Sequence, residues 1–283
     1  MLFRSVSPLI TKDASTCLRE PEEVLRQVCK AVREAGQKIM QFYRRGAEVM
    51  LKEDNSPLTA ADQASHKFLL QALRDLTPRI NVVSEESSER CCDSLVGEAW
   101  WLVDPLDGTK EFIKGTDEFT VNVALIESGR PVLGVVHAPA LHLTYFALRS
   151  FGAWRQADNG LPTPIAVRRF DSSDRIGVVA SKDHAGPLVK DMLARLKNPV
   201  LQSMGSSLKF CLVAEGKADL YLRDLPTMEW DTGAAQCIVE AAGGGVFILD
   251  GEPLRYGKTN LKNPAIMTVG DTGFDWKSLI SKS

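Results

Sequence analysis

The sequence lacks several features that would assign it to a common class of protein. Its 283 residues contain no run of about 18 apolar residues, so we expect no helix that crosses a membrane. The formal net charge is only −2, which gives no electrostatic reason to expect binding to DNA, RNA or a membrane surface. There is no P-loop and no G-x-S-x-G motif. Two frequent signatures of nucleotide-binding proteins and hydrolases are therefore excluded.

Cysteine and histidine are also not arranged for a metal site. The chain has six cysteines and four histidines. No two cysteines have the C-x-x-C spacing, and the histidines do not have the spacing of zinc ligands. The cysteines therefore predict reduced thiols in a cytosolic protein rather than a disulfide framework or a zinc site.

The N-terminal segment has a short apolar patch that Pro8 interrupts, which is too weak for a signal peptide. We interpret residues 1–20 as a disordered leader. A hydrophobic content of 44% allows one large domain or two smaller ones. The loop-like composition from residue 158 onward favours two, an N-terminal α+β metal-binding domain at 21–157 and a C-terminal α/β domain at 158–283.

The stretch Trp100–Phe112 carries the strongest chemical signal. Its apolar residues 100–103 predict a strand buried on both faces, which a turn at 104–109 then ends. Asp104 and Asp107 lie on that turn, beside a helix start for which Thr109 is the expected N-cap. Carboxylate oxygens next to the free N–H groups of a helix start suit magnesium and phosphate. The alternative is a turn without chemistry, because Asp, Pro and Gly all favour turns.

Three more carboxylates are candidates for the same site. Glu85 follows a predicted buried strand at 80–83, much as Asp104 follows its own strand, so neighbouring strands would deliver both to one rim. Asp62 has capping-box spacing from Thr59, and Asp231 precedes an apolar helix. Each of the last two has a purely structural alternative as a helix cap. If the acids converge, their mutual repulsion requires cations.

The remaining pattern predicts helices over an antiparallel or mixed sheet in the first half and an α/β layer in the second. An amphipathic helix begins at Pro21. In the first half, strands are expected at 119–126, 131–137, 143–148 and 153–155. In the second half, we expect a strand at 176–180, helices near 188–196 and 207–214, a strand at 218–222, and a helix after Asp231 that ends at Gly243–Gly245.

Together these motifs resemble a known family. Ser84-Glu85-Glu86, Asp104-Pro105-Leu106-Asp107-Gly108-Thr109 and Trp230-Asp231 resemble the magnesium-dependent, lithium-sensitive phosphatases of the inositol monophosphatase superfamily. The resemblance covers roughly residues 21–270, with the motifs in the order that the family has. Residues 55–62, 108–112 and 205–210 are similar to the branch of CysQ-type 3'(2'),5'-bisphosphate nucleotidases. Inositol monophosphatases more often have Thr where this chain has Lys110.

The resemblance implies an α/β fold, a layered αβαβα sandwich of the inositol monophosphatase and fructose-1,6-bisphosphatase type. It also implies two or three Mg²⁺ ions and a water activated by Asp62 and Thr109, with Asp62 binding one of the ions. The implied metal ligands are Glu85, Asp104, Asp107, Asp231 and the carbonyl of Leu106. The N–H groups of Gly108 and Thr109 would bind the reacting phosphate.

The same resemblance implies the substrate. His184, Ser206, Lys209 and Arg223 match the positions that hold adenosine and its 5'-phosphate in this branch. The expected activity is hydrolysis of 3'-phosphoadenosine 5'-phosphate, a by-product of sulfur metabolism, to AMP and phosphate in the cytoplasm. Some members of the branch are found at the cytoplasmic face of the inner membrane. Two alternatives stay open: an inositol or other sugar phosphatase, and a catalytically silent metal- or nucleotide-binding regulator.

Overall fold

The computed structural model describes residues 18–44, 49–51, 57–87, 98–158, 160–171, 175–180, 186–196 and 199–276. The predictions that concern residues 1–17, the motif residues 55–56, the Cys91-Cys92 pair and His184 lie outside these ranges. Leu18, within the predicted leader, is buried in the hydrophobic core. In the part of the chain that is described, no helix combines the length and hydropathy that crossing a membrane requires.

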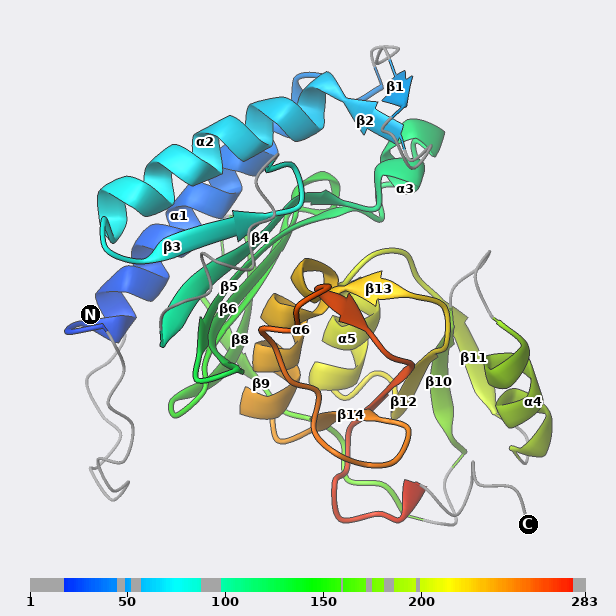
Figure 1. Cartoon of the computed structure of the whole chain (residues 1–283). Coiled ribbons are helices and arrows are strands. Elements are labelled where there is room, and N and C mark those ends of the chain that lie inside the picture. Colours follow the sequence, from blue (N-terminus) through cyan, green and yellow to red (C-terminus); the bar gives the residue numbers. More distant parts are fainter. Residues whose placement is uncertain are drawn as a thin grey trace.

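Two long helices form the first layer (Figure 1). Helix α1, Pro21–Met40, has Pro at its first position, acids in its first turn and Lys38 in its last, as the helix dipole favours. Its apolar stripe is buried together with that of α2, Ala60–Leu76, in one core cluster. Both helices cover the same face of a large sheet.

That sheet has seven strands in sequence order: β3 (Asn81–Ser84), β4 (Ala99–Asp107), β5 (Thr120–Glu127), β6 (Arg130–Ala138), β7 (Leu143–Leu148), β8 (Gly152–Ala157) and β9 (Thr163–Ile165). Only the β3–β4 pair is parallel, so the sheet is mixed. The sequence had predicted an antiparallel or a mixed sheet. Strand β9 continues the sheet past residue 158, where the sequence placed a boundary between two domains. That boundary stays a prediction.

Strand β4 is buried on both faces, as its composition predicted. Trp101 and Val103 pack in the core under α1 and α2, whereas Trp100 and Leu102 pack in a second core on the opposite face. The prediction that the strand ends at residue 103 is wrong. Pairing with β5 resumes at Asp107 and Thr120 after an irregularity in register, so both aspartates belong to the strand.

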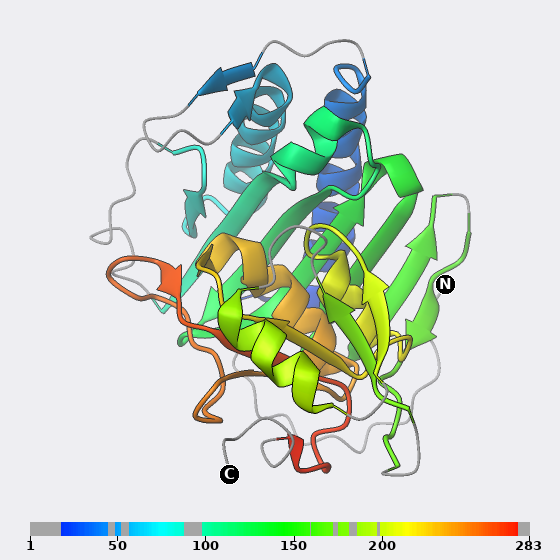
Figure 2. The same ribbon diagram turned by 90° about the vertical axis from the view of Figure 1, so that its right-hand side faces the viewer.

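The second half supplies the other three layers (Figures 1 and 2). Helices α5, Leu208–Ala214, and α6, Glu229–Ala241, lie against the second face of the large sheet. Behind them is a five-stranded sheet in the order β11 (Val200–Ser203), β10 (Gly177–Ala180), β12 (Leu220–Arg223), β16 (Ile266–Val269) and β14 (Gly245–Ile248). Its outer face packs against α4, Pro187–Arg195. The predicted αβαβα sandwich is confirmed.

Short elements complete the fold. They are β1 (Val49–Leu51), β2 (Pro57–Thr59), α3 (Thr109–Lys114), the 3-10 helix η2 (Pro139–Leu141), β13 (Thr227–Met228) and β15 (Lys262–Asn263). Strand β2 leads directly into α2, and α3 follows β4 after a single residue. The termini of β2, β4, α5 and α6 therefore position the polar residues that are discussed below.

One glycine allows α6 to lie close to the sheet. A Cβ atom at Gly134 of β6 would be 2.3 Å from the carbonyl oxygen of Ala234 and 2.8 Å from Cβ of Cys237. Neither atom lies at the end of a flexible side chain. The helix could make room only by moving away from the sheet as a whole.

We therefore expect Gly134→Ala to lower the free energy of unfolding by about 3 kcal/mol, the upper end of the usual overpacking cost. Urea unfolding followed by circular dichroism would measure it. Gly160→Ala is the matched control, because its nearest neighbour would be 3.5 Å away. Equal stability of the two variants would contradict the close approach.

Candidate active site

Four carboxylates converge at one edge of the large sheet. Glu85 directly follows β3, and its N–H donates to the carbonyl of Val103 in β4 at 3.1 Å. Because β3 and β4 are parallel, Glu85 and Asp104 emerge at the same edge, as the sequence predicted. Asp107 lies at the end of β4. Asp231 comes from the first turn of α6, in the other half of the chain.

The electrostatics of this cluster oppose the simultaneous ionisation of its members. Burial raises the pKa of Asp104 well above its usual value, and the charges of Glu85, Asp107 and Asp231 add to the effect. Burial likewise raises the pKa of Asp231, with Asp107 and Glu85 as further causes. A cation would relieve this repulsion. Among the described residues, no three Asp, Glu, His or Cys side chains already stand close enough to enclose one.

Asp107 is held by an unusual concentration of donors. Its Oδ2 accepts hydrogen bonds from Ser206 Oγ (2.6 Å), Ser207 N (2.7 Å), Ser207 Oγ (2.8 Å), Asn122 Nδ2 (3.3 Å) and Thr120 Oγ1 (3.4 Å). Oδ1 accepts none from the described part of the chain. The side chain is therefore fixed through one oxygen, and the other remains available to a ligand.

The other two aspartates are oriented in the same way. Oδ1 of Asp104 accepts the N–H of Leu106 at 3.1 Å, and Oδ2 of Asp231 accepts the N–H of Met228 at 2.8 Å. The second bond also shows that Asp231 caps its helix, so the structural alternative for this residue holds too. In each case the second carboxylate oxygen has no hydrogen bond within the described ranges. Fixed carboxylate oxygens together with a backbone carbonyl are donors that fit Mg²⁺.

Asp62 has the capping role that the sequence offered, and its second carboxylate oxygen contacts Thr109. It forms the predicted capping box, because its N–H donates to Thr59 Oγ1 at 3.4 Å and its Oδ2 accepts the N–H of Thr59 at 2.8 Å. Its Oδ1 instead accepts a hydrogen bond from Thr109 Oγ1 at 3.5 Å. The cap thus uses one oxygen and leaves the other directed at Thr109.

Thr109 is not the N-cap of its helix, contrary to the sequence prediction. That position belongs to Gly108, whose φ of 90° lies in the left-handed region that glycine adopts without strain. Thr109 is the first residue of α3, and its hydroxyl also donates to the carbonyl of Leu106 at 3.3 Å. The implied ligand carbonyl and the implied catalytic hydroxyl are therefore direct neighbours.

A pocket of about 260 Å³ is lined by three of these acids and by three cations. Glu85, Asp107 and Asp231 line it together with Lys110, Lys209 and Arg223. Negative and positive groups in one pocket suit a ligand that carries more than one phosphate, with metal ions at one of them.

Three of the four predicted nucleotide-binding residues line this pocket. Lys209 donates from Nζ to the carbonyl of Ser206 at 2.6 Å, and burial lowers its pKa to about 8. Nε of Arg223 donates to the carbonyl of Leu225 at 3.2 Å. The hydroxyl of Ser206 is bonded to Asp107 and Thr120.

Sequence reasoning missed the residues that hold Asp107. Ser207 lies within a motif that was noticed, but no role was assigned to it. Thr120 and Asn122 interrupt an otherwise apolar strand and are almost fully buried. Buried polar residues in an apolar run require partners, and this was the available signal.

The layered sandwich with its acidic pocket defines the class of the protein, a phosphatase of the αβαβα type. The chain belongs to the inositol monophosphatase family, whose family model matches residues 20–272. It is 47% identical over 235 residues to the 3'(2'),5'-bisphosphate nucleotidase CysQ of Escherichia coli K12, covering 82% of this chain and 94% of that protein.

Two further relatives support the same family assignment. The CysQ nucleotidase of Haemophilus influenzae is 38% identical over 262 residues, covering 91% of this chain and 97% of the relative. The crystal structure of CysQ from Bacteroides thetaiotaomicron, a bacterial member of the inositol monophosphatase family, superposes with a TM-score of 0.77 at 38% identity. The match covers 88% of this chain and 97% of that one. Family and fold thus agree with the resemblance that the motifs indicated.

Proposed function

We propose that the protein hydrolyses the 3'-phosphate of 3'-phosphoadenosine 5'-phosphate to give AMP and phosphate. The observation that carries this proposal is the single pocket in which the Glu85, Asp107 and Asp231 carboxylates meet Lys209 and Arg223. One phosphate needs metal-assisted cleavage, and the other needs only positive charge. The nucleotidase activity that names the relatives from E. coli and H. influenzae supports the same substrate.

Glu85, Asp104, Asp107, Asp231 and the carbonyl of Leu106 would hold two or three magnesium ions, with Asp62 contributing to one of them. When bound, magnesium supplies charge neutralisation at the phosphoryl and leaving oxygens and acidifies a water molecule. Three of these carboxylates are held in place: Asp104 by the N–H of Leu106, Asp231 by the N–H of Met228, and Asp107 by Ser206 and Ser207. Fixed donors need little reorganisation during the reaction.

Asp62 and Thr109 would activate the attacking water. Thr109 Oγ1, which donates to Asp62 Oδ1, can accept a proton from water while it passes its own to the carboxylate. The water oxygen then bonds to phosphorus in line with the 3'-oxygen, and the P–O3' bond breaks. The 3'-oxygen takes up a proton from solvent water, and Asp62 releases its own proton to solvent. No covalent intermediate with the enzyme is needed. The N–H groups of Gly108 and Thr109 would bind the oxygens of the transferred phosphoryl group.

Ser206, Lys209 and Arg223, with His184 from outside the described ranges, would hold the adenosine and its 5'-phosphate. Burial lowers the pKa of Lys209 to about 8, which leaves it mostly charged at neutral pH, and a bound phosphate would favour that charged form further. We also place the protein in the cytoplasm. The buried free thiols of Cys29, Cys211 and Cys237 are consistent with a reducing compartment.

Phosphate release from purified protein tests the proposal. We expect magnesium-dependent release from 3'-phosphoadenosine 5'-phosphate, no release with EDTA, and inhibition by lithium. Inositol 1-phosphate, assayed in parallel, should react at least about tenfold more slowly, because it offers no second phosphate to Lys209 and Arg223. Preference for inositol 1-phosphate would overturn the nucleotide assignment but keep the metal chemistry. No release from either would favour a silent binding protein.

A further inference from the structure

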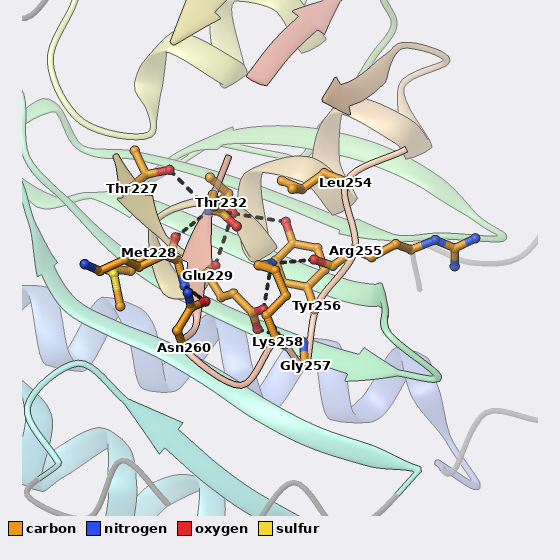
Figure 3. A network of polar contacts seen from close by, with 12 residues as sticks. Thr227, Met228, Glu229, Thr232, Leu254, Arg255, Tyr256, Gly257, Lys258 and Asn260 are labelled. Atoms are coloured by element: carbon orange, nitrogen blue, oxygen red, sulfur yellow. Dashed lines mark hydrogen bonds and ion pairs between the residues drawn. The ribbon is translucent and has the colours of Figure 1, made fainter. Parts of the chain in front are cut away.

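Within the described part of the chain, the hydrogen bonds and the ion pair of one buried carboxylate, Glu229, all come from a single segment, Leu254–Asn263 (Figure 3). Glu229 is the first residue of α6, and its side chain is 0% exposed. Its Oε2 accepts the N–H of Gly257 at 2.9 Å. Its Oε1 accepts the N–H of Lys258 at 2.9 Å and pairs with Nζ of the same lysine at 2.7 Å. A buried carboxylate is stable only with such partners.

The 254–263 segment also secures the backbone at the beginning of α6. The N–H of Glu229 donates to the carbonyl of Leu261 at 2.9 Å. Asn263 Nδ2 donates to the carbonyl of Met228 at 2.8 Å and to Thr232 Oγ1 at 3.0 Å. The first turn of α6, which carries Asp231, is thus bonded to this segment through both backbone and side chains.

The same segment is fixed to the large sheet. The N–H of Tyr256 donates to the carbonyl of Gly129, in the turn between β5 and β6, at 3.1 Å. Gly257 lies on the ring of Trp100, because a Cβ atom there would be 3.1 Å from Cη2 of the indole. Trp100 belongs to β4, the strand of Asp104 and Asp107. One segment therefore contacts two of the elements that bring acids to the pocket, β4 and α6.

We propose that Glu229 is a positioning residue that sets the place of Asp231 relative to Asp104 and Asp107. This inference rests on the proposed metal-dependent function. Glu229 does not line the pocket, whereas Asp231, two residues later, does. By joining α6 to a segment that lies on β4, Glu229 fixes the spacing between ligands from the two halves of the chain. Residues that hydrogen-bond directly to metal ligands typically affect metal affinity by about 10-fold to 100-fold. Glu229 acts one contact further out, so we expect its effect at the lower end of this range.

The variant Glu229→Gln tests the inference. Its amide keeps one carbonyl acceptor but places an NH₂ group against donors that now find a carboxylate. We expect the Mg²⁺ dissociation constant, measured by titration calorimetry without substrate, to rise about tenfold or more. Lys258→Met removes the ammonium group but leaves the two N–H bonds, so it should raise the constant in the same direction and by less.

Glu215→Gln is the matched control. Glu215 is also a buried carboxylate paired with a lysine, Lys217, and it accepts a hydrogen bond from Tyr145 of the large sheet at 3.2 Å. It follows α5 and does not line the pocket. We expect its magnesium affinity to stay within about twofold of that of the unaltered protein. All variants are compared at a temperature where circular dichroism shows them folded, and Lys258→Met decides if Glu229→Gln does not fold.

The outcomes separate the inference from the proposed function. Unchanged magnesium affinity in Glu229→Gln and Lys258→Met would overturn the positioning role and leave the nucleotidase proposal intact. An equal loss in Glu215→Gln would show a general effect of destabilisation and would also overturn it. If the unaltered protein bound no magnesium, the metal site and the role of Glu229 would fall together.

Discussion

Asp107→Asn is expected to reduce the rate of phosphate release at least about a thousandfold, the loss of several kcal/mol of metal-assisted stabilisation. The fold should survive, because an amide carbonyl can replace Oδ2 and accept from the donors of Ser206 and Ser207. The NH₂ group then takes the position of Oδ1. It has neither the charge nor the lone pair that a cation requires.

Initial rates at saturating magnesium and thermal unfolding would measure the two effects separately. Asp219→Asn is the matched control, since Asp219 is 1% exposed, accepts hydrogen bonds from Arg168 and Gly177, and does not line the pocket. It should lose stability and keep its rate. A rate for Asp107→Asn within about tenfold of the unaltered enzyme would contradict the assignment of Asp107 to the metal site.

Asp62→Asn should lower kcat by about 10² to 10⁴, the usual contribution of a general base. Stability should change little, because the amide carbonyl can still accept the N–H of Thr59, which now donates to Asp62 Oδ2 at 2.8 Å. What the variant loses is the negative charge beside the hydroxyl of Thr109. Single-turnover kinetics would show whether the chemical step itself has slowed.

If Asp62 is both a helix cap and the general base, Thr59→Val should lose stability and keep its rate, the reverse of Asp62→Asn. The valine removes the hydroxyl that accepts the N–H of Asp62 and donates to Asp62 Oδ2, but not to the Oδ1 that faces Thr109. It should cost about 1 kcal/mol of stability, a typical loss for an N-cap. The rate should stay within a few-fold. A variant Asp62→Asn that unfolds more easily yet turns over normally would show that Asp62 is only a helix cap.

The proximity of Glu85 and Asp104 could be predicted from the sequence, because each follows a buried strand and local patterns are enough to find those strands. The hydrogen-bond partners of Asp107 could not be predicted in this way. The N–H of Ser207 reaches this carboxylate across 100 residues of sequence. Such a contact depends on how α5 packs against the sheet, and hydrophobic periodicity does not encode that packing.

The error at Thr109 has a similar origin. Threonine is a good N-cap by local preference, but pairing of Asp107 with Thr120 keeps the chain extended up to that point. Only Gly108 then remains to change its direction before α3 begins. A tertiary constraint from β5 therefore overrode a preference that was locally sound.

Gly134 carries a consequence for how such a protein can diverge. It touches no substrate, and yet any side chain there would push α6, and with it Asp231, away from the sheet that carries Asp104 and Asp107. Selection for turnover would therefore act on a residue in the middle of a strand. Related proteins could change the residues that line the pocket and accept new phosphate esters, but the distance between α6 and the large sheet could not change.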